Sequence, residues 1–171
     1  MTNENPMKEI KLEKVVLNIG AGGPGEKLEK AKNLLESLTG RKTKITKARG
    51  RSAFGVSKGR DIGAMVTLRE NEAERFLERV FEAKENRISR DVFDQQGNLS
   101  LGIKEHIDLP GTDYDPEVGI FGMDVAVKLE RPGFRIKKKK VSKEIGKDHK
   151  ISKDEAISFI QKNFDVEVVG D

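Results

Sequence analysis

Residues 41–60 read RKTKITKARGRSAFGVSKGR and contain eight lysines and arginines but no aspartate or glutamate. β-branched residues in positions 43–47 are typical of a strand, and four glycines in positions 50–63 are typical of a loop. The run AMVTLR at residues 64–69 predicts a returning strand. The stretch is therefore predicted to form a β-hairpin with an oversized basic tip. A loop of this length inside a compact domain is usually functional or disordered.

Strands and helices are predicted to alternate around this hairpin. Apolar residues at even positions predict a half-buried strand over residues 9–19, and leucines at helical spacing predict a helix over residues 25–38 that Gly40 ends. A second helix is expected from Asn71, where Glu74 stands at the right spacing for a capping box.

The second half of the chain continues this pattern. Residues 96–98 form a turn signal, and the alternating runs 99–103 and 123–129 predict two further strands. Ser152 and Glu155 predict a capping box at the start of a last helix.

These elements indicate an α+β fold. We predict an antiparallel sheet with helices packed on one face, in a split β-α-β-like order, with a long basic hairpin loop. Residues 1–130 are expected to form a single α+β domain, and residues 131–171 a basic C-terminal extension whose short helix packs on that domain.

Positive charge is concentrated in two segments. Residues 131–143 (RPGFRIKKKKVSK) carry seven further cations and no acid, and outside both segments 18 basic residues stand against 29 acidic ones. Basic patches on an acidic body are typical of proteins that bind phosphate backbones. Phe54 among the arginines of the first segment suits contact with unstacked RNA bases. The charge pattern therefore predicts an RNA-binding protein.

Other classes of function find little support. The chain has no cysteine and no run of about 20 apolar residues, so we expect a soluble, intracellular protein without disulfides or a membrane span. His106 and His149 have no ligand-spaced partners, and the acids of residues 113–117 indicate a turn. We therefore predict no enzyme activity, no metal and no cofactor.

One motif leaves an alternative open. GAGGPG at residues 20–25 matches G-x-G-x-x-G between a predicted strand and a predicted helix, as in dinucleotide-binding enzymes. The acid expected about 20 residues further on is missing, and Pro24 removes an amide donor. A tight turn is the preferred interpretation, and a dinucleotide-binding enzyme is the alternative.

Several motifs stand in register from about residue 9 to residue 129. They are VVLNIG (15–20), TGRK (39–42), ITKAR (45–49), IG (62–63), VTLR (66–69), GNLSLGIKE (97–105), DYD (113–115) and GMD (122–124). Together they resemble the ribosomal protein L-five family, the 5S-rRNA binders of the large subunit. The basic segment and helix beyond Arg131 resemble the C-terminal extension of the archaeal and eukaryotic branch.

The resemblance implies a cytoplasmic, structural constituent of the large ribosomal subunit that helps attach 5S rRNA in the central protuberance. It also implies contacts with P-site tRNA, with neighbouring large-subunit rRNA and proteins, and with a small-subunit protein at an intersubunit bridge. It places 5S-rRNA contacts at or near Asn18, Arg41, Lys42, Lys44, Thr46, Lys47, Thr67 and Arg69. In the tRNA-facing loop, residues 48–63, the candidates are Arg49, Arg51, Phe54, Lys58 and Arg60. Additional rRNA contacts are expected at Arg131, Arg135, Lys137, Lys138, Lys139 and Lys140.

The chain departs from the family pattern at three positions. Ser57 stands where a basic residue is frequent, Arg60 where an acid is frequent, and Glu70 where a glycine is usual. An RNA-binding protein with no place in the ribosome is the remaining alternative.

Overall fold

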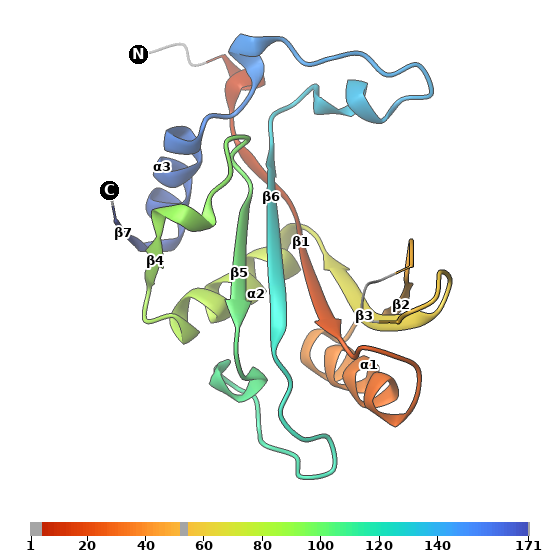
Figure 1. The fold of residues 1–171 in the computed structure, drawn as a ribbon. Helices are drawn as coiled ribbons and strands as arrows, with labels where there is room; N and C mark the ends of the chain where they lie inside the picture. The colour runs from red at the N-terminus through yellow and green to blue at the C-terminus, as the bar shows by residue number, and fades with distance from the viewer. Residues whose placement is uncertain (1–4, 52–54, 171) are drawn as a thin grey trace. The chain divides into compact units, whose positions relative to one another are not determined.

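The computed structural model describes residues 5–51 and 55–170 of the 171-residue chain (Figure 1). Within these ranges the elements are β1 (Lys11–Gly20), α1 (Glu26–Thr39), β2 (Lys44–Lys47), β3 (Asp61–Leu68), α2 (Glu70–Ala83), β4 (Arg87–Ser89), β5 (Leu99–Ile103), β6 (Met123–Glu130), α3 (Lys153–Phe164) and β7 (Glu167–Val169). Five strands form an antiparallel sheet in the order β2-β3-β1-β6-β5, and β4 pairs with β7 in parallel. The predicted α+β fold is confirmed. No helix in the described ranges is long and apolar enough to cross a membrane.

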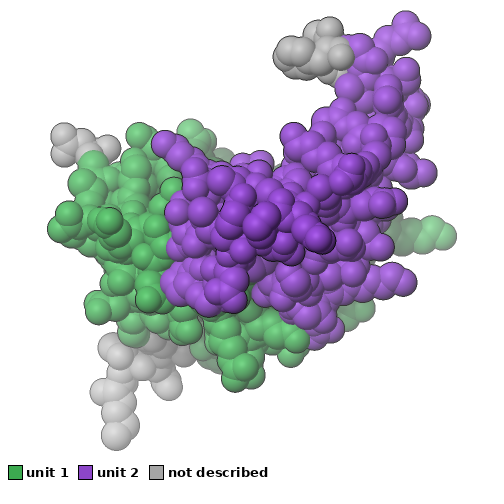
Figure 2. Space-filling view, turned by 90° about the horizontal axis from the view of Figure 1, so that it is seen from below, with its two compact units in different colours: residues 1–14, 69–100, 127–171 green, residues 15–68, 101–126 purple. Residues whose placement is uncertain are grey.

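The chain divides into two compact units, which Figure 2 colours separately. Unit 1 comprises residues 1–14, 69–100 and 127–171, and unit 2 comprises residues 15–68 and 101–126. Residues 131–171 therefore share a unit with α2 and β4. Their expected role as an extension on a domain of residues 1–130 stays a prediction.

In unit 2, β1 directs its odd-numbered side chains into the core. Val15, Leu17 and Ile19 are at most 1% exposed, whereas Val16 and Asn18 are only half-buried. The expected strand is confirmed, but the assignment of its buried face to even positions was wrong. Apolar residues occupy both parities of this strand, so alternation alone could not choose the face.

Helix α1 begins and ends within one residue of the bounds that its leucines predict. Its apolar positions are buried, and Gly40 ends it in the left-handed conformation at φ 64°, with its N–H donating to the Glu36 carbonyl at 2.8 Å. This is the conformation for which glycine is favoured at a helix end. The helix packs against β3, so the core face of β3 is covered within this unit.

The predicted hairpin consists of β2 and β3, but β3 begins at Asp61 and not at residue 64. Gly63 lies within the ladder, paired with Thr46 on one side and Gly20 on the other. A Cβ atom at Gly63 would lie 2.7 Å from the Ile19 carbonyl oxygen and 3.0 Å from Thr46 Oγ1. Glycine is therefore required here by the close approach of the neighbouring strand.

In unit 1, α2 is the second predicted helix, and it buries an apolar stripe that includes Phe76, Leu77 and Val80. Its predicted capping box was wrong, because the helix begins at Glu70 after Arg69 and has no side-chain cap. Glu70 adopts φ 53°, a left-handed conformation that strains a residue with a Cβ atom. The glycine that is usual here would adopt it without that cost.

The end of the chain completes unit 1. The capping box of α3 is confirmed, with Ser152 and Glu155 bonded reciprocally. Phe164 packs edge-on against Phe81 of α2 at 5.4 Å between ring centroids. Just beyond it, β7 pairs with β4, a short strand that the sequence pattern did not indicate.

Candidate nucleic-acid interface

One face of the β1–β3 part of the sheet, in unit 2, carries the polar candidates together. Strand register places Asn18 and Lys44 on opposite sides of Met65, Thr46 opposite Gly63, and Thr67 opposite Val16. These side chains alternate with the buried ones and are half-buried or exposed. We call Asn18, Lys44, Thr46 and Thr67 the open-face residues.

The open-face residues are free to bind a ligand. Their side-chain polar groups have no hydrogen-bond or ion-pair partner within residues 5–51 and 55–170. Neighbouring strands lie about 4.8 Å apart, so Asn18 and Lys44 lie within about 10 Å of each other. A hydroxyl, an amide and an ammonium at this spacing can contact the riboses, base edges and phosphates of an RNA helix.

The remaining candidates for 5S rRNA surround these strands. Arg41 and Lys42 are exposed between α1 and β2, next to the buried Thr43, whose N–H donates to Glu36 Oε1 at 3.0 Å. Lys47 ends β2 and lies 3.9 Å from Asp61 as an exposed ion pair. Arg69 is exposed at the start of α2 and belongs to unit 1.

The loop between β2 and β3 presents its cations to solvent. Its base is closed by two hydrogen bonds, from Ala48 N–H to the Arg60 carbonyl at 2.8 Å and from Gly59 N–H to the Ala48 carbonyl at 2.9 Å. Arg49, Arg51, Lys58 and Arg60 are exposed. The candidate Phe54 lies outside the described residues.

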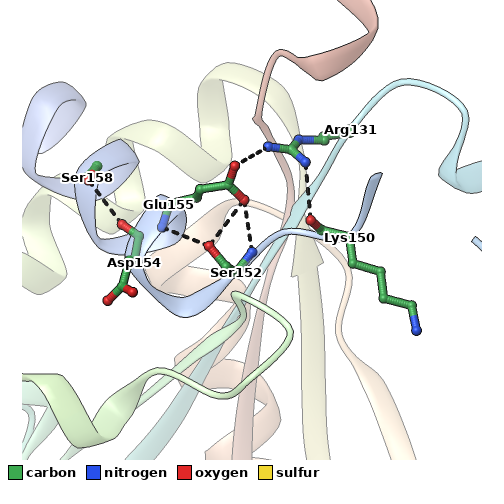
Figure 3. Close-up of polar contacts among 6 residues, drawn as sticks. All are labelled: Arg131, Lys150, Ser152, Asp154, Glu155 and Ser158. Carbon is green, nitrogen blue, oxygen red and sulfur yellow. Dashed lines mark hydrogen bonds and ion pairs between the residues drawn. The ribbon is translucent and has the colours of Figure 1, made fainter. Parts of the chain in front are cut away.

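The basic segment of unit 1 divides into buried and exposed cations. Arg135, Lys137, Lys139 and Lys140 are exposed. Arg131 is only 6% exposed, as its guanidinium donates to Glu155 Oε1 at 2.8 Å and to the Lys150 carbonyl at 3.1 Å (Figure 3). Arg131 thus links the end of β6 to the start of α3, and it is the least available of the six cations for RNA.

A charged cluster of Glu13, Lys128, Lys138 and Glu130 was missed from the sequence. Lys138 Nζ donates to Glu13 Oε1, and Lys128 Nζ lies 2.7 Å from Glu13 Oε2. Burial would raise the pKa of Glu13, but the two ammonium groups outweigh it and lower the pKa to about 2. The available signal was parity, since Glu13 occupies an odd, inward position of β1.

The cluster also shifts the pKa values of Glu130 and Lys138. Burial, and then the Glu13 charge, raise the pKa of Glu130. The hydrogen bond to Glu13 raises the pKa of Lys138, while the positive charge of Arg69 opposes that increase. Arg69 and Lys138 therefore contribute to the same local field in unit 1.

The glycine-rich turn at residues 20–25 does not form a dinucleotide site. The N–H groups of Ala21 and Gly22 donate to the Ile62 carbonyl at 2.9 and 3.0 Å, so they are not aimed at a phosphate. The strand before the turn pairs antiparallel with β3, whereas a dinucleotide fold needs parallel strands joined by a crossover helix. The tight-turn interpretation agrees with this geometry.

Both histidines make packing contacts with other side chains or backbone groups. His106 is 1% exposed, and its Nδ1 accepts from Phe121 N–H at 3.3 Å. His149 Nε2 lies 2.8 Å from the Pro132 carbonyl oxygen, and its ring packs edge-on against Phe134. In the ranges that the structure describes, no three histidines or acids are grouped to hold a metal ion.

A sheet face with unpartnered polar groups, beside an exposed arginine- and lysine-rich loop, is typical of an RNA-binding protein. The comparisons with known proteins agree with this class. A family model described as "Ribosomal protein L5" matches residues 5–56, and a second model, for the C-terminus of the same ribosomal family, matches residues 61–164. The chain belongs to the ribosomal protein uL5 family.

Individual relatives match over nearly their whole length. Large ribosomal subunit protein uL5 of Sulfurisphaera tokodaii is 52% identical over 168 residues, which cover 96% of this chain and 95% of the relative. The corresponding protein of Pyrobaculum aerophilum is 49% identical over 166 residues (96% and 93%), and that of Archaeoglobus fulgidus is 48% identical over 161 residues (93% and 90%). The resemblance seen in the motifs is confirmed, and membership of a ribosomal family agrees with the prediction of a non-enzymatic protein.

Proposed function

We propose that this chain is a structural constituent of the large ribosomal subunit that binds 5S rRNA through the open-face residues. The observation that carries the proposal is that these four side chains share one sheet face and have no partner in the described ranges. The relatives' names as large-subunit proteins support the same assignment. We expect this binding to help attach 5S rRNA in the central protuberance of the large subunit.

The side chains divide into two kinds of contact. Asn18, Thr46 and Thr67 are suited to hydrogen bonds with riboses or base edges, which distinguish RNA from DNA and fix the register. Lys44 and Arg69, together with Arg41, Lys42 and Lys47, are suited to phosphates, which supply most of the affinity and its dependence on salt.

Measurement of 5S-rRNA binding over a series of salt concentrations tests this assignment. Affinity should fall steeply with salt, and Lys44→Ala should weaken binding and reduce the salt slope by about one. Lys27→Ala, which removes an exposed lysine from α1, is the matched control and should leave the slope unchanged. A flat salt dependence, or equal effects of the two variants, would contradict the proposal. Competition with unrelated duplex RNA separates specific 5S binding from general RNA binding.

The loop of residues 48–63 is proposed to reach P-site tRNA. The protein is also proposed to touch a small-subunit protein at an intersubunit bridge. Support comes from the four exposed cations and from the closed base of the loop, which separates it from the open face. Deletion of residues 50–59 should spare 5S-rRNA binding and impair tRNA-dependent steps of translation. If the deletion alone abolishes 5S binding, the two surfaces have been assigned the wrong way round.

The basic segment of unit 1 is proposed to add contacts with neighbouring large-subunit rRNA. Its exposed members are Arg135, Lys137, Lys139 and Lys140, and Lys138 is half exposed beside them. Residues 131–171 would thus act as an RNA-binding extension of the protein.

A further inference from the structure

Unit 1 contains a cavity of about 210 Å³ that the proposed 5S surface does not use. Its walls come from the turn before β5, from the end of β6 and from the basic segment with the residues that follow it. A drug-sized molecule needs roughly 300–1,000 Å³, so this space suits a smaller ligand such as a single nucleobase.

The cavity has an apolar floor and a flat aromatic wall. Leu129, Ile145 and Ile151 line it and are at most 5% exposed. Phe134 also lines it, and its ring packs edge-on against the His149 ring at 5.6 Å between centroids. An apolar floor beside an aromatic ring favours a planar, stackable group over a hydrated ion.

The rim carries amide groups that can hydrogen-bond to a base edge. Gln95 and Gln96 are exposed, and their side-chain amides make no hydrogen bond to other described residues. Asn98 donates its Nδ2 to Asp94 Oδ2 at 2.8 Å, which leaves Oδ1 as an acceptor. Amides that both donate and accept match the mixed donor and acceptor pattern of nucleobase edges.

The charge of the lining is positive. Four lysines and no acid line the cavity. Lys128 and Lys138 are neutralised by the Glu13 and Glu130 carboxylates behind them, so they add little net charge.

Two of the lining lysines, Lys137 and Lys150, form no ion pair within the described parts of the chain. The Lys150 side chain extends away from the contact between Arg131 and Glu155 (Figure 3). Two available ammonium groups at the rim favour an anionic ligand such as a phosphodiester.

We infer that this cavity binds one unstacked nucleotide of an RNA strand, with its base against Phe134 and its phosphates near Lys137 and Lys150. The inference rests on the proposed RNA-binding function but assigns unit 1 a second and different mode of recognition. The open face would bind a helix, whereas the cavity would capture a base that has left the stack. An aspartate- or glutamate-rich protein segment would satisfy the lysines but not the flat apolar wall.

The test titrates the full chain with a single-stranded adenosine hexanucleotide and, separately, with AMP. We expect the side-chain amide NMR signals of Gln95, Gln96 and Asn98 to shift with both ligands. Phe134→Leu should weaken hexanucleotide binding about fivefold or more, because loss of one stacked base has an effect of that order. Gln96→Ala and Lys137→Ala change exposed positions and should also weaken it.

Matched variants and a competitor decide the outcome. Gln161→Ala and Lys143→Ala also remove exposed side chains of unit 1, but these do not line the cavity, so neither should change hexanucleotide affinity. Absence of amide shifts, equal weakening by the matched variants, or equal displacement by hexaglutamate would overturn the inference. The open-face proposal is tested separately, whichever of these outcomes is found. Lys44→Ala should weaken 5S-rRNA binding and leave hexanucleotide binding unchanged.

Discussion

Replacement of Glu13 by glutamine should destabilise the protein in a pH-dependent way. The Glu13 side chain is 3% exposed and contacts two ammonium groups, those of Lys128 and Lys138. The amide of glutamine keeps the shape of the side chain but removes its charge. Lys128 and Lys138 are partly exposed and can be hydrated in the variant, so the loss should be smaller than for a fully buried pair.

The pKa of Glu13 determines the size of the effect. Its folded-state pKa of about 2 lies below the ordinary value of 4.5. The charged carboxylate therefore stabilises the native state fully at pH values above 4.5. The contribution is lost as the pH falls through about 2. The difference corresponds to about 3 kcal/mol at neutral pH, and less than half of it remains at about pH 3. The raised pKa of Glu130 acts in the opposite direction, because removal of the Glu13 charge relieves Glu130. We therefore expect a net loss of about 2 kcal/mol in the variant at neutral pH.

Urea unfolding of the wild type and Glu13→Gln at about pH 7 and about pH 3 measures this difference. The control is Glu26→Gln, which breaks an ion pair of 2.7 Å to Lys30 on the surface of α1, where Glu26 is 79% exposed. The control should change stability much less than Glu13→Gln does at neutral pH, because solvent screens an exposed ion pair. A gap for Glu13→Gln that stays constant with pH, or one no larger than that of the control, would refute the electrostatic account.

Three further predictions concern the stability of the fold, each measured by urea unfolding. Gly63→Ala should lower the free energy of unfolding by about 1–3 kcal/mol, because a strand carbonyl occupies the space of the new methyl group. The control Gly20→Ala meets no atom within 4 Å and should be tolerated. Equal costs would contradict the steric argument. Glu70→Gly should stabilise the protein by up to about 1 kcal/mol, because it relieves the strain of the left-handed conformation at φ 53°. A loss of stability would show that the Glu70 side chain contributes more than its strain costs. Arg131→Ala should cost about 2–4 kcal/mol of stability, because it removes a buried guanidinium that donates to two acceptors. The control Arg90→Ala removes an exposed ion pair and should cost less than about 1 kcal/mol. Similar values for both would count against burial as the cause.

The features that were predicted correctly from the sequence are local ones. The bounds of α1 follow from leucine spacing and Gly40, and the capping box of α3 depends on two residues only three positions apart. The buried face of β1 was misassigned because Val16 and Leu17 are both apolar, and only packing against the rest of the unit distinguishes them. The pairing of β4 with β7 joins segments about 80 residues apart in the chain, beyond the reach of any local pattern.

The candidate site shows the same division. The basic character of residues 41–60 was evident from composition, and the resemblance to the family selected Asn18, Thr46 and Thr67. Their position on one face depends on strand register, which the close approach at Gly63 helps to define. The cluster around Glu13 joins residues more than 100 positions apart, so no spacing in the sequence could reveal its partners.

The pairing of β4 with β7 also bears on the order in which the protein can fold during synthesis. Every segment of unit 2 has been made once residue 126 is added, whereas β7, the partner of β4, spans residues 167–169 and is made about 40 residues later. The edge of β4 therefore stays unpaired until β7 has been made, and until then it is a site where another strand or a chaperone can bind.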